Sequence, residues 1–333
     1  MTTEAIVRPV TEADAAGLLA LAEVLDTMNL PGDPAAVAQL IAGSRAAFAG
    51  QPRGEGTFVL VAELAGRLVG TASLIARHGS PQKPHHYLEV ISRPVRSESL
   101  DLSYIRHLLR LGTDETPRTE LGGLVVHPDA RGQGLGKLLL GARLLLIAAH
   151  RQWFCARLIA ELLPPLRDDG GNAFWDAIGG RLTGLAYYRA DRLCRADTTF
   201  ISEVWPQGDV ILELLPEPAR AVLGQVGART EPIRSLLQRV GFRYLNTVDP
   251  FDAGPHYGAR CADVPAMAAS SAATLSADAP RAELETMLCL TADLHIGLAG
   301  VQRDADVVRL APEEAQRLGC APGSSLWTMP WSW

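Results

Sequence analysis

The run from Leu121 to Leu140, LGGLVVHPDARGQGLGKLLL, constrains the fold of this chain more than any other segment. An apolar stretch at 124–126 is typical of a strand buried on both faces, and Pro128 ends it because proline cannot donate to a ladder. The leucine-rich stretch that follows predicts a helix over 138–147. Between them, glycines at 132, 134 and 136 let the backbone pass close to a ligand, at the positive end of the helix dipole. We therefore expect this turn to bind an anion such as a phosphate.

Two other glycine-rich phosphate sites can be compared with this turn. A P-loop requires Gly-Lys-Ser/Thr because its hydroxyl holds magnesium, whereas Gly136 and Lys137 are followed here by Leu138. A dinucleotide site requires GxGxxG and a distal acid. The spacing is instead Arg131, two residues, Gly134, one residue and Gly136, which resembles the acyl-CoA pyrophosphate loop of the GCN5-related N-acetyltransferase superfamily. A glycine turn that only packs a helix on a sheet is the alternative.

Composition limits the classes of protein to which this chain can belong. Its 333 residues allow two domains, and 47% hydrophobic residues is ordinary for a globular protein. The 31 basic and 37 acidic residues are interspersed and give a net charge of −6, so neither a nucleic-acid partner nor a membrane surface is predicted. Residues 1–6 lack a basic n-region, and no window approaches about 18 uncharged apolar residues, so we expect a cytoplasmic protein. The five cysteines are odd in number and widely spaced, which predicts neither a disulfide framework nor a cysteine zinc site.

On either side of the glycine-rich turn, the hydrophobic pattern predicts strands and helices. Strands are expected at 6–10, 58–62, 68–74 and 158–162, and helices at 11–25, 35–48 and 174–178. The last of these helices is expected to end on a glycine cap at Gly179 and Gly180. Residues 92–118 are polar and give no clear assignment. A helix, a glycine and a strand recur at 233–245, which we interpret as a partial, degenerate second copy of the same half-motif.

These elements predict an α+β fold in three parts. Residues 1–257 form an acetyltransferase-like domain, with a mixed sheet and helices, whose degenerate second half begins near residue 200. Residues 258–282 include a stretch rich in Ala, Ser and Asp and are expected to be a linker or surface arm. Residues 283–333 are expected to form a small β-rich C-terminal domain, because 307–329 resembles the strand, short helix, glycine and strand unit of double-psi β-barrels.

Several separated segments resemble the arginine N-succinyltransferase family. They are IVRPV at 6–10, LGGLVVHPDARGQGLG at 121–136, IAEL at 159–162, FWDAIGGR at 174–181, YRADRLC at 188–194, LGQV at 223–226 and GFRYLNTVDPFDAGP at 241–255. The resemblance implies an acetyltransferase-like fold that transfers succinyl from succinyl-CoA to the α-amine of arginine, in amino-acid catabolism. The family includes two-subunit versions, so it also implies a homodimer or a heteromer with a related chain.

The resemblance further implies that the turn and the strand before it bind succinyl-CoA or another acyl-CoA. In the superfamily this strand supplies backbone groups to the pantetheine arm and thioester, which places Leu124 at the acyl-CoA and Val126 at the next amide. Arg131 suits a phosphate contact because a guanidinium pairs well with phosphate oxygens. The predicted cofactor-binding residues are Leu124, Val125, Val126, Arg131, Gly132, Gln133, Gly134, Leu135 and Gly136.

The chain departs from the family at positions that concern the acceptor. Where the family has a histidine directly after its GQV segment, taken as its proton donor, this chain has Gly227, and a glycine moves no proton. Leu163 and Pro164 follow the AEL segment at 160–162, where the family tends to have Arg and Gly. The tyrosine acid usual in the superfamily corresponds to Trp175, whose indole cannot protonate a thiolate. Two alternatives to arginine succinylation therefore remain, an acyltransferase for a different amine or acyl-CoA and a non-catalytic acyl-CoA-binding subunit.

Another residue must then move the proton if the chain is an enzyme. His256 beside Asp252 is one candidate, because histidine titrates near neutral pH and a carboxylate could orient it; a solvent-exposed loop histidine is the alternative. Glu161, at the end of the expected strand 158–162, is the second candidate, with a structural carboxylate as its alternative.

Substrate binding is assigned to one cluster in the family segments, and no metal site is predicted. The predicted substrate-binding residues are Tyr188, Arg189, Asp191 and Asp252, although the first three could equally belong to a strand that ends in an ion pair. His85 and His86 invite a metal, but neighbours on a strand point to opposite faces and no second pair at ligand spacing accompanies them.

Overall fold

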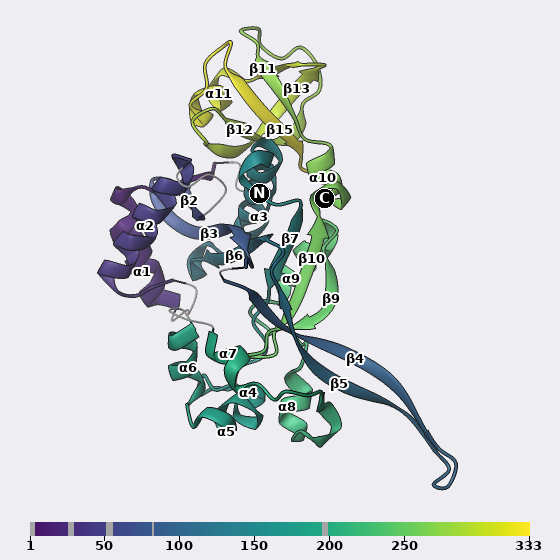
Figure 1. Cartoon of the computed structure of the whole chain (residues 1–333). Helices are drawn as coiled ribbons and strands as arrows, with labels where there is room; N and C mark the ends of the chain where they lie inside the picture. The colour runs from purple at the N-terminus through teal and green to yellow at the C-terminus, as the bar shows by residue number, and fades with distance from the viewer. Residues whose placement is uncertain (1–3, 26–29, 51–55, 82, 195–198) are drawn as a thin grey trace.

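The computed structural model describes residues 4–25, 30–50, 56–81, 83–194 and 199–333. Figure 1 shows a central body with a C-terminal lobe at one end, a group of short helices at the other, and a long two-stranded ribbon that projects outward. Within the described residues, the strands follow one hydrogen-bonded order, β12-β15-β11-β14-β13-β1-β2-β3-β6-β7-β10-β9-β4-β5-β8. No helix of the described residues is long and apolar enough to cross a bilayer.

The central sheet contains the strands predicted around the glycine-rich turn. They are β1 (Ile6–Pro9), β2 (Thr57–Leu64), β3 (Arg67–His78), β6 (Arg118–Val126) and β7 (Arg157–Glu161). Neighbours in this group are antiparallel except β6 and β7, which run parallel. The mixed sheet predicted from the sequence is therefore confirmed.

Three helices cover the two faces of this sheet. The helix α3 (Leu135–Ala149) is buried along almost its whole length in the largest apolar cluster, with side chains of β2, β3 and β7. The helices α1 (Ala15–Leu25) and α2 (Pro34–Phe48) pack with Val59, Val61 and Val125 in a second cluster. Both helices were predicted, and Asp33 caps α2 by accepting a hydrogen bond from the Ala36 amide.

The polar region 92–118, which the sequence left unassigned, belongs mainly to a long hairpin. Its strands are β4 (His85–Ser97) and β5 (Leu102–Asp114), and they pair from His85↔Asp114 to Ser97↔Leu102. Much of this ribbon is exposed on both faces, so it lacks the apolar alternation that marks a half-buried strand. The hairpin was missed for that reason.

Short helices follow β7 and form the opposite end of the molecule (Figure 1). They are α4 (Ala173–Ala177), α5 (Gly179–Thr183), α6 (Tyr187–Cys194), α7 (Thr199–Val204) and α8 (Glu217–Val222), with the two-residue strand β8 (Val210–Ile211) between α7 and α8. The predicted glycine cap at 179–180 is wrong, because these glycines begin α5, and the left-handed glycine that ends it is Gly184.

The repeat at 233–245 is confirmed as a helix, a glycine and a strand. The helix α9 (Glu231–Arg239) is followed by Gly241 at a φ of 106° and by β9 (Arg243–Val248). The strand β10 (Pro255–Arg260) pairs with both β7 and β9, so this unit extends the central sheet.

The expected linker at 258–282 is largely structured. It contains the end of β10, the short helix α10 (Pro265–Ala268) and the strand β11 (Ser271–Leu275). The side chains of β11 alternate, so that Ala273 and Leu275 face the core. Because most residues of this strand are small, its composition resembles that of a linker.

The C-terminal lobe is β-rich, as predicted, and includes β11. Its other elements are β12 (Glu285–Thr291), β13 (Ile296–Asp304), β14 (Val307–Leu310), α11 (Pro312–Leu318) and β15 (Ser325–Pro330). It joins the central sheet through β13, which pairs with β1. Trp331 packs against α3 at Gly141, and Lys137 lies over the Trp331 ring at 4.3 Å.

Candidate active site

The glycine-rich turn lies between the end of β6 and the first turn of α3. Gly132 and Gly134 have φ values of 76° and 84°, a left-handed backbone that glycine adopts without strain, and Gly134 is the N-cap of α3. A Cβ at either glycine would meet no atom within 4 Å, so the space over the turn is open. The first amides of an α-helix lack partners within it, and those of α3 point toward this space. The turn therefore has the geometry predicted for an anion site.

The side chains of the predicted cofactor residues take different directions. Arg131 Nε donates to the Val126 carbonyl at 3.2 Å, and the Gln133 amide donates to the Asp129 carbonyl at 3.3 Å. Leu135 is buried in the core, so its backbone alone can contact a ligand. Gly136 faces Ile233 of α9 at 3.7 Å, measured from an added Cβ.

Beside the turn, β6 and β7 separate and leave a pocket. They pair at Thr119↔Leu158 and Glu120↔Ile159, and β6 then bulges at Gly123, whose φ is 57°. Separating parallel strands expose backbone groups that a ligand can use. The cavity measures about 250 Å³ and is lined by Glu120, Leu121, Gly122, Gly123, Leu124, Arg143, Ala160, Glu161, Leu162, Leu163, Arg229, Thr230, Ile233, Leu237, Asp249 and Asp252.

Only part of the predicted cofactor strand faces this pocket. Leu124 lines it, whereas the Val125 side chain packs in the apolar cluster of α1 and α2. Val126 pairs with Gly70 of β3 and packs against the main core. Leu124 is therefore the apolar side chain of this strand that can touch a ligand in the pocket.

Arg143 is a buried cation in the wall of the pocket. The residue is 2% exposed, and its guanidinium donates to the carbonyls of Gly122 and Leu139 at 3.2 and 3.3 Å. No described carboxylate forms an ion pair with it. Burial lowers the pKa of Arg143 to about 9, so the group still carries its charge at neutral pH. An isolated buried charge is costly, and an anion in the pocket would offset that cost.

Carboxylates line the same pocket. Asp249 Oδ1 accepts the amides of Phe251 and Asp252 at 2.6 and 3.0 Å, and Asp252 Oδ1 accepts that of Gly254 at 2.7 Å. Burial and the nearby Glu161 raise the pKa of Asp249 to about 6. Burial and the neighbouring Asp249 raise the pKa of Asp252 well above its ordinary range. Crowded acids of this kind are stabilised by a cationic ligand.

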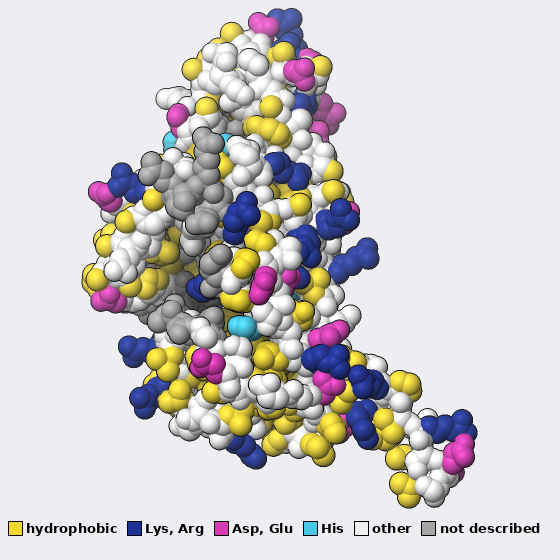
Figure 2. All heavy atoms as spheres, in the orientation of Figure 1, with side chains coloured by type: hydrophobic (Ala, Val, Ile, Leu, Met, Phe, Trp, Pro, Cys, Tyr) yellow, Lys and Arg dark blue, Asp and Glu magenta, His cyan; other side chains and the backbone are white. Residues whose placement is uncertain are grey.

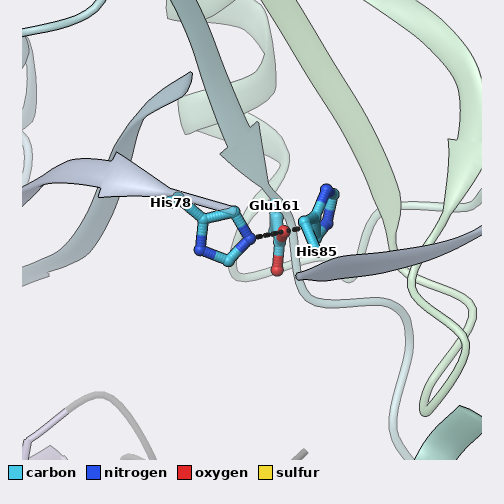
Figure 3. A group of neighbouring side chains, drawn as sticks. All are labelled: His78, His85 and Glu161. Carbon is cyan, nitrogen blue, oxygen red and sulfur yellow. Dashed lines mark ion pairs between the residues drawn. The ribbon is translucent and has the colours of Figure 1, made fainter. Parts of the chain in front are cut away.

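Glu161, at the end of β7, is surrounded by three histidines from three other strands. Figure 3 shows its carboxylate between His78 of β3 and His85 of β4. Its Oε1 lies 2.9 Å from His85 Nε2, 3.5 Å from His78 Nε2 and 3.9 Å from His256 Nε2. Burial opposes protonation of His78, yet the carboxylates of Glu120 and Glu161 raise its pKa to about 9, whereas burial lowers the pKa of His256 to about 4.

The structure corrects the environment expected for His256. Its side chain is fully buried, so the alternative of a solvent-exposed loop histidine is wrong. The residue lies on β10 opposite Glu161 of β7, and its Nδ1 lies 3.2 Å from the Thr247 hydroxyl. The carboxylate beside it is therefore that of Glu161, and the expected pairing with Asp252 is replaced by this one because strand register decides which side chains meet.

The predicted cluster at 188–194 is also placed differently from expectation. The segment is the helix α6, so the strand alternative is wrong, and Tyr188 is 64% exposed while Arg189 is also exposed. The neighbour Tyr187 is buried instead, with its hydroxyl 3.5 Å from Asp252 Oδ2, and Asp191 raises the pKa of that carboxyl further. Helical periodicity turns adjacent residues to different faces, which separates Tyr187 from Tyr188.

The structure also places the positions that differ from the arginine N-succinyltransferase pattern. Leu163 lines the pocket, whereas Gly227 and Trp175 are buried. Gly227 is buried just before α9, and its amide donates to the Leu163 carbonyl at 2.9 Å. A Cβ there would lie 2.8 Å from the Pro164 oxygen, which is too close for any side chain without a backbone shift. Trp175 is buried, and its indole donates to the Leu185 carbonyl at 2.9 Å, so it packs the core.

Sequence reasoning missed four polar residues of this region and considered a fifth, His85, only as a metal ligand that it then rejected. The four missed residues are His78, Glu120, Arg143 and Asp249. One signal was available for Arg143, because it is the single charged residue in the apolar run 138–149. The others come from separate strands, and nothing in their spacing along the chain indicates that they meet.

Comparison with known proteins assigns the chain to a family. A family model described as arginine N-succinyltransferase beta subunit matches residues 5–266. Arginine N-succinyltransferase subunit beta from Pseudomonas aeruginosa is 32% identical over 335 residues, which cover 98% of this chain and 98% of that protein. Arginine N-succinyltransferase from an Enterobacter species is 33% identical over 256 residues, or 75% of this chain and 74% of that protein. The solved structure of arginine/ornithine succinyltransferase subunit AI from Pseudomonas aeruginosa covers 98% of both chains with a TM-score of 0.82 at 25% identity, in agreement with the predicted α+β fold. The chain belongs to the arginine N-succinyltransferase family.

Proposed function

We propose that this chain transfers a succinyl group from succinyl-CoA to the α-amine of arginine. The observation that carries the proposal is a pocket beside the glycine-rich turn that holds a buried guanidinium together with several carboxylates. The names of the relatives, arginine N-succinyltransferase among them, support the same reaction.

The donor side is supported by the turn and by Arg143. The turn offers helix amides to a pyrophosphate, and the bulge of β6 at Gly122–Leu124 adjoins the pocket where a thioester would lie. Succinyl differs from acetyl by a terminal carboxylate. Arg143 is the buried cation that could pair with that carboxylate, since a guanidinium can bind it through two parallel hydrogen bonds.

The acceptor side is supported by the acidic residues. Arginine carries a cationic guanidinium and an amine, and the pocket wall holds the half-buried Asp249 and the buried Asp252, both with raised pKa values. Glu161 lines the pocket and His256 does not, so Glu161 is the member of the predicted catalytic pair that faces the acceptor. In the reaction the amine nitrogen forms a bond to the thioester carbon, the carbon–sulfur bond breaks, and the amine loses a proton to a base. CoA leaves as the thiolate, which takes up a proton from the protonated base or from water to become the thiol.

The Gly227 backbone favours one alternative, an acyltransferase for a different amine. Because Pro164 leaves no space for a side chain at 227, the pocket edge is built without the family histidine. An amine with a different shape could then occupy that edge. A chain that binds acyl-CoA without turnover is the remaining outcome.

The test of the proposed reaction is CoA release by the purified full chain. Succinyl-CoA or acetyl-CoA is combined with arginine, ornithine or lysine, and free thiol and the acylated product are measured. We expect the fastest release with succinyl-CoA and arginine. Faster turnover with another amine would favour the alternative, and CoA binding without turnover would indicate a non-catalytic subunit.

Arg143→Met tests the role assigned to the buried guanidinium. Loss of a charge-assisted hydrogen bond is expected to lower kcat/KM for succinyl-CoA by about 10–100-fold. The value for acetyl-CoA, which lacks the terminal carboxylate, should change much less. If Arg143 only held the β6 bulge through the Gly122 carbonyl, the values for succinyl-CoA and acetyl-CoA would fall equally. The ratio of the two kcat/KM values therefore distinguishes a contact with the succinyl carboxylate from a purely structural role.

We also propose that the chain acts in the cytoplasm as part of an assembly. The word subunit in the names of the family model and of the full-length relative supports a multi-chain protein. The projecting β4–β5 ribbon offers a surface for a second copy of the chain.

A further inference from the structure

We propose that His78, His85, His256 and Glu161 bind one divalent transition-metal ion of the zinc class. This site shares Glu161 with the proposed succinyl transfer, but its metal content can be measured without measuring acyl transfer. Its members come from β3, β4, β10 and β7, four strands that meet at the base of the projecting ribbon.

The first argument is that the cluster contains buried polar atoms without hydrogen-bond partners. Among the described residues, His78 Nε2, His85 Nε2, His256 Nε2 and Glu161 Oε1 are buried and form no hydrogen bond outside this cluster, where the three imidazoles face the carboxylate in ion-pair contacts. An unpaired buried polar atom costs free energy, and native proteins contain few of them. Here three imidazole nitrogens lie within 3.9 Å of the one carboxylate oxygen of Glu161, an arrangement that a bound cation would explain.

The second argument is the separation of these atoms. Zinc binds imidazole nitrogen and carboxylate oxygen at about 2.0–2.2 Å, so tetrahedral ligand atoms lie about 3.4 Å apart. Glu161 Oε1 is 2.9, 3.5 and 3.9 Å from the Nε2 atoms of His85, His78 and His256. The donor atoms of His78, His85 and Glu161 all lie within 4.8 Å of one another, and those of Glu161, Asp249 and His256 form a second such group.

The third argument is the support behind the ligands. A histidine that binds metal through one ring nitrogen usually donates from the other to a carboxylate or another acceptor. His78 Nδ1 lies 3.0 Å from Glu120 Oε2, and His256 Nδ1 lies 3.2 Å from the Thr247 hydroxyl. In both histidines the Nε2 atom therefore remains available toward Glu161.

The donor set selects the class of ion. Three imidazoles and one carboxylate suit zinc and its neighbours in the first transition row, whereas magnesium and calcium prefer oxygen ligands. An ion there would tie β4 to β3, β7 and β10 and would fix the carboxylate of Glu161 at the pocket wall. We assign it this positioning role.

The experiment measures the metal content of the full chain, purified without a histidine tag or chelator. We expect about one zinc per chain by elemental analysis, since zinc commonly binds four ligands drawn from histidine and carboxylate side chains. His85→Asn and Glu161→Gln should each abolish stoichiometric binding. The matched control is His86→Asn, since His86 is the next residue on β4 and its Nδ1 lies 3.2 Å from the Thr113 hydroxyl.

Two further measurements keep the test independent of folding defects. Thr247→Val leaves all four ligands in place and should weaken zinc binding by about 10–100-fold, as loss of an outer hydrogen bond to a metal ligand typically does. A chelator should lower the Tm of the unmodified chain, and added zinc should restore it. Metal-free protein whose Tm does not respond to zinc would overturn the proposal, as would equal zinc in the ligand variants and the control. None of these readouts depends on acyl transfer.

Discussion

Gly227 shows how the identity of one residue depends on the chain that packs against it. Its amide donates to the Leu163 carbonyl, and the oxygen of Pro164 occupies the place where a Cβ would lie. Leu163 and Pro164 therefore pack directly against the position where the family has its histidine, and the two departures from the family belong to one local arrangement. Restoring the histidine alone cannot restore the family pattern.

Gly227→His is expected to destabilise the chain and to leave acyl transfer no faster. Overpacking against a backbone oxygen should lower the free energy of unfolding by about 1–3 kcal/mol. Urea denaturation measures this change, with Ala228→His as the control at an exposed neighbour, where we expect less than about 0.5 kcal/mol. A stable Gly227→His variant with faster CoA release would contradict the packing argument.

Asp14 is a second residue whose chemistry depends on its partners. Burial opposes its ionisation, but two hydrogen bonds from Arg8, at 2.8 and 2.9 Å, and bonds from Thr11 lower the pKa of its carboxyl. This carboxylate links β1 to the short 3-10 helix Glu12–Asp14 that leads into α1, through the capping box at Thr11.

Asp14→Asn should cost about 1–3 kcal/mol at pH 7, because it removes hydrogen bonds between charged groups. A carboxyl with a lowered pKa in the folded state stabilises that state above its unfolded pKa of about 3.9 and loses this contribution as pH falls through the folded value. The difference between the two proteins should therefore shrink below about pH 4. Urea denaturation at several pH values checks this, and a difference that stays constant in acid would argue against the ion pair.

Among the elements, the turn before α3 is the one whose backbone conformation is most directly tied to ligand binding. Gly134 has a left-handed φ in open space, whereas Gly136 lies within the first turn of the helix. The two glycines are two residues apart and differ in backbone conformation, which makes them a matched pair.

Gly134→Ala should weaken CoA binding, because a left-handed backbone costs a non-glycine residue about 1–2 kcal/mol and the turn would relax away from it. Gly136→Ala should bind CoA nearly as well, since its added Cβ has 3.7 Å to the nearest atom. Isothermal titration with CoA measures both affinities. Equal losses in the two variants would show that space rather than backbone conformation limits this turn.

In the whole molecule, the β4–β5 ribbon is the feature with the least support from the rest of the fold. Only its base has further strand neighbours in the described structure, at Leu88–Glu89 against β9 and at Leu108–Leu109 against β8. A two-stranded ribbon alone is marginally stable in water. Its far end nevertheless exposes apolar side chains, with Leu100 73% and Ile105 52% exposed, and Figure 2 shows hydrophobic and basic side chains along it.

We expect the purified chain to be a dimer in which this ribbon contacts a second copy. Replacing Leu100 and Ile105 together by Glu should shift the molar mass to that of a monomer, because charge at an apolar interface is strongly unfavourable. Light scattering coupled to size exclusion measures this, and Leu214→Glu, at another exposed leucine, serves as the control. A monomeric unmodified chain would contradict this expectation.

The sequence by itself determined the parts of this protein that depend on neighbours in the chain. The strands and helices around the turn, the turn itself and the β-rich C-terminal lobe follow from hydrophobic period, proline and glycine, and they were predicted correctly. The long hairpin was missed because its exposed strands have no apolar period. The segment 258–282 was interpreted as a linker because small side chains can also fill a strand face.

Only the tertiary structure decided which polar side chains meet. His78, His85, Glu161 and His256 are spread over 179 positions of the chain and come together through strand order and register. The same register places His256 beside Glu161 and not beside Asp252. Helical periodicity in α6 buries Tyr187 and exposes Tyr188. A chain sequence records local preference, whereas contacts between distant strands depend on the packing of the whole core.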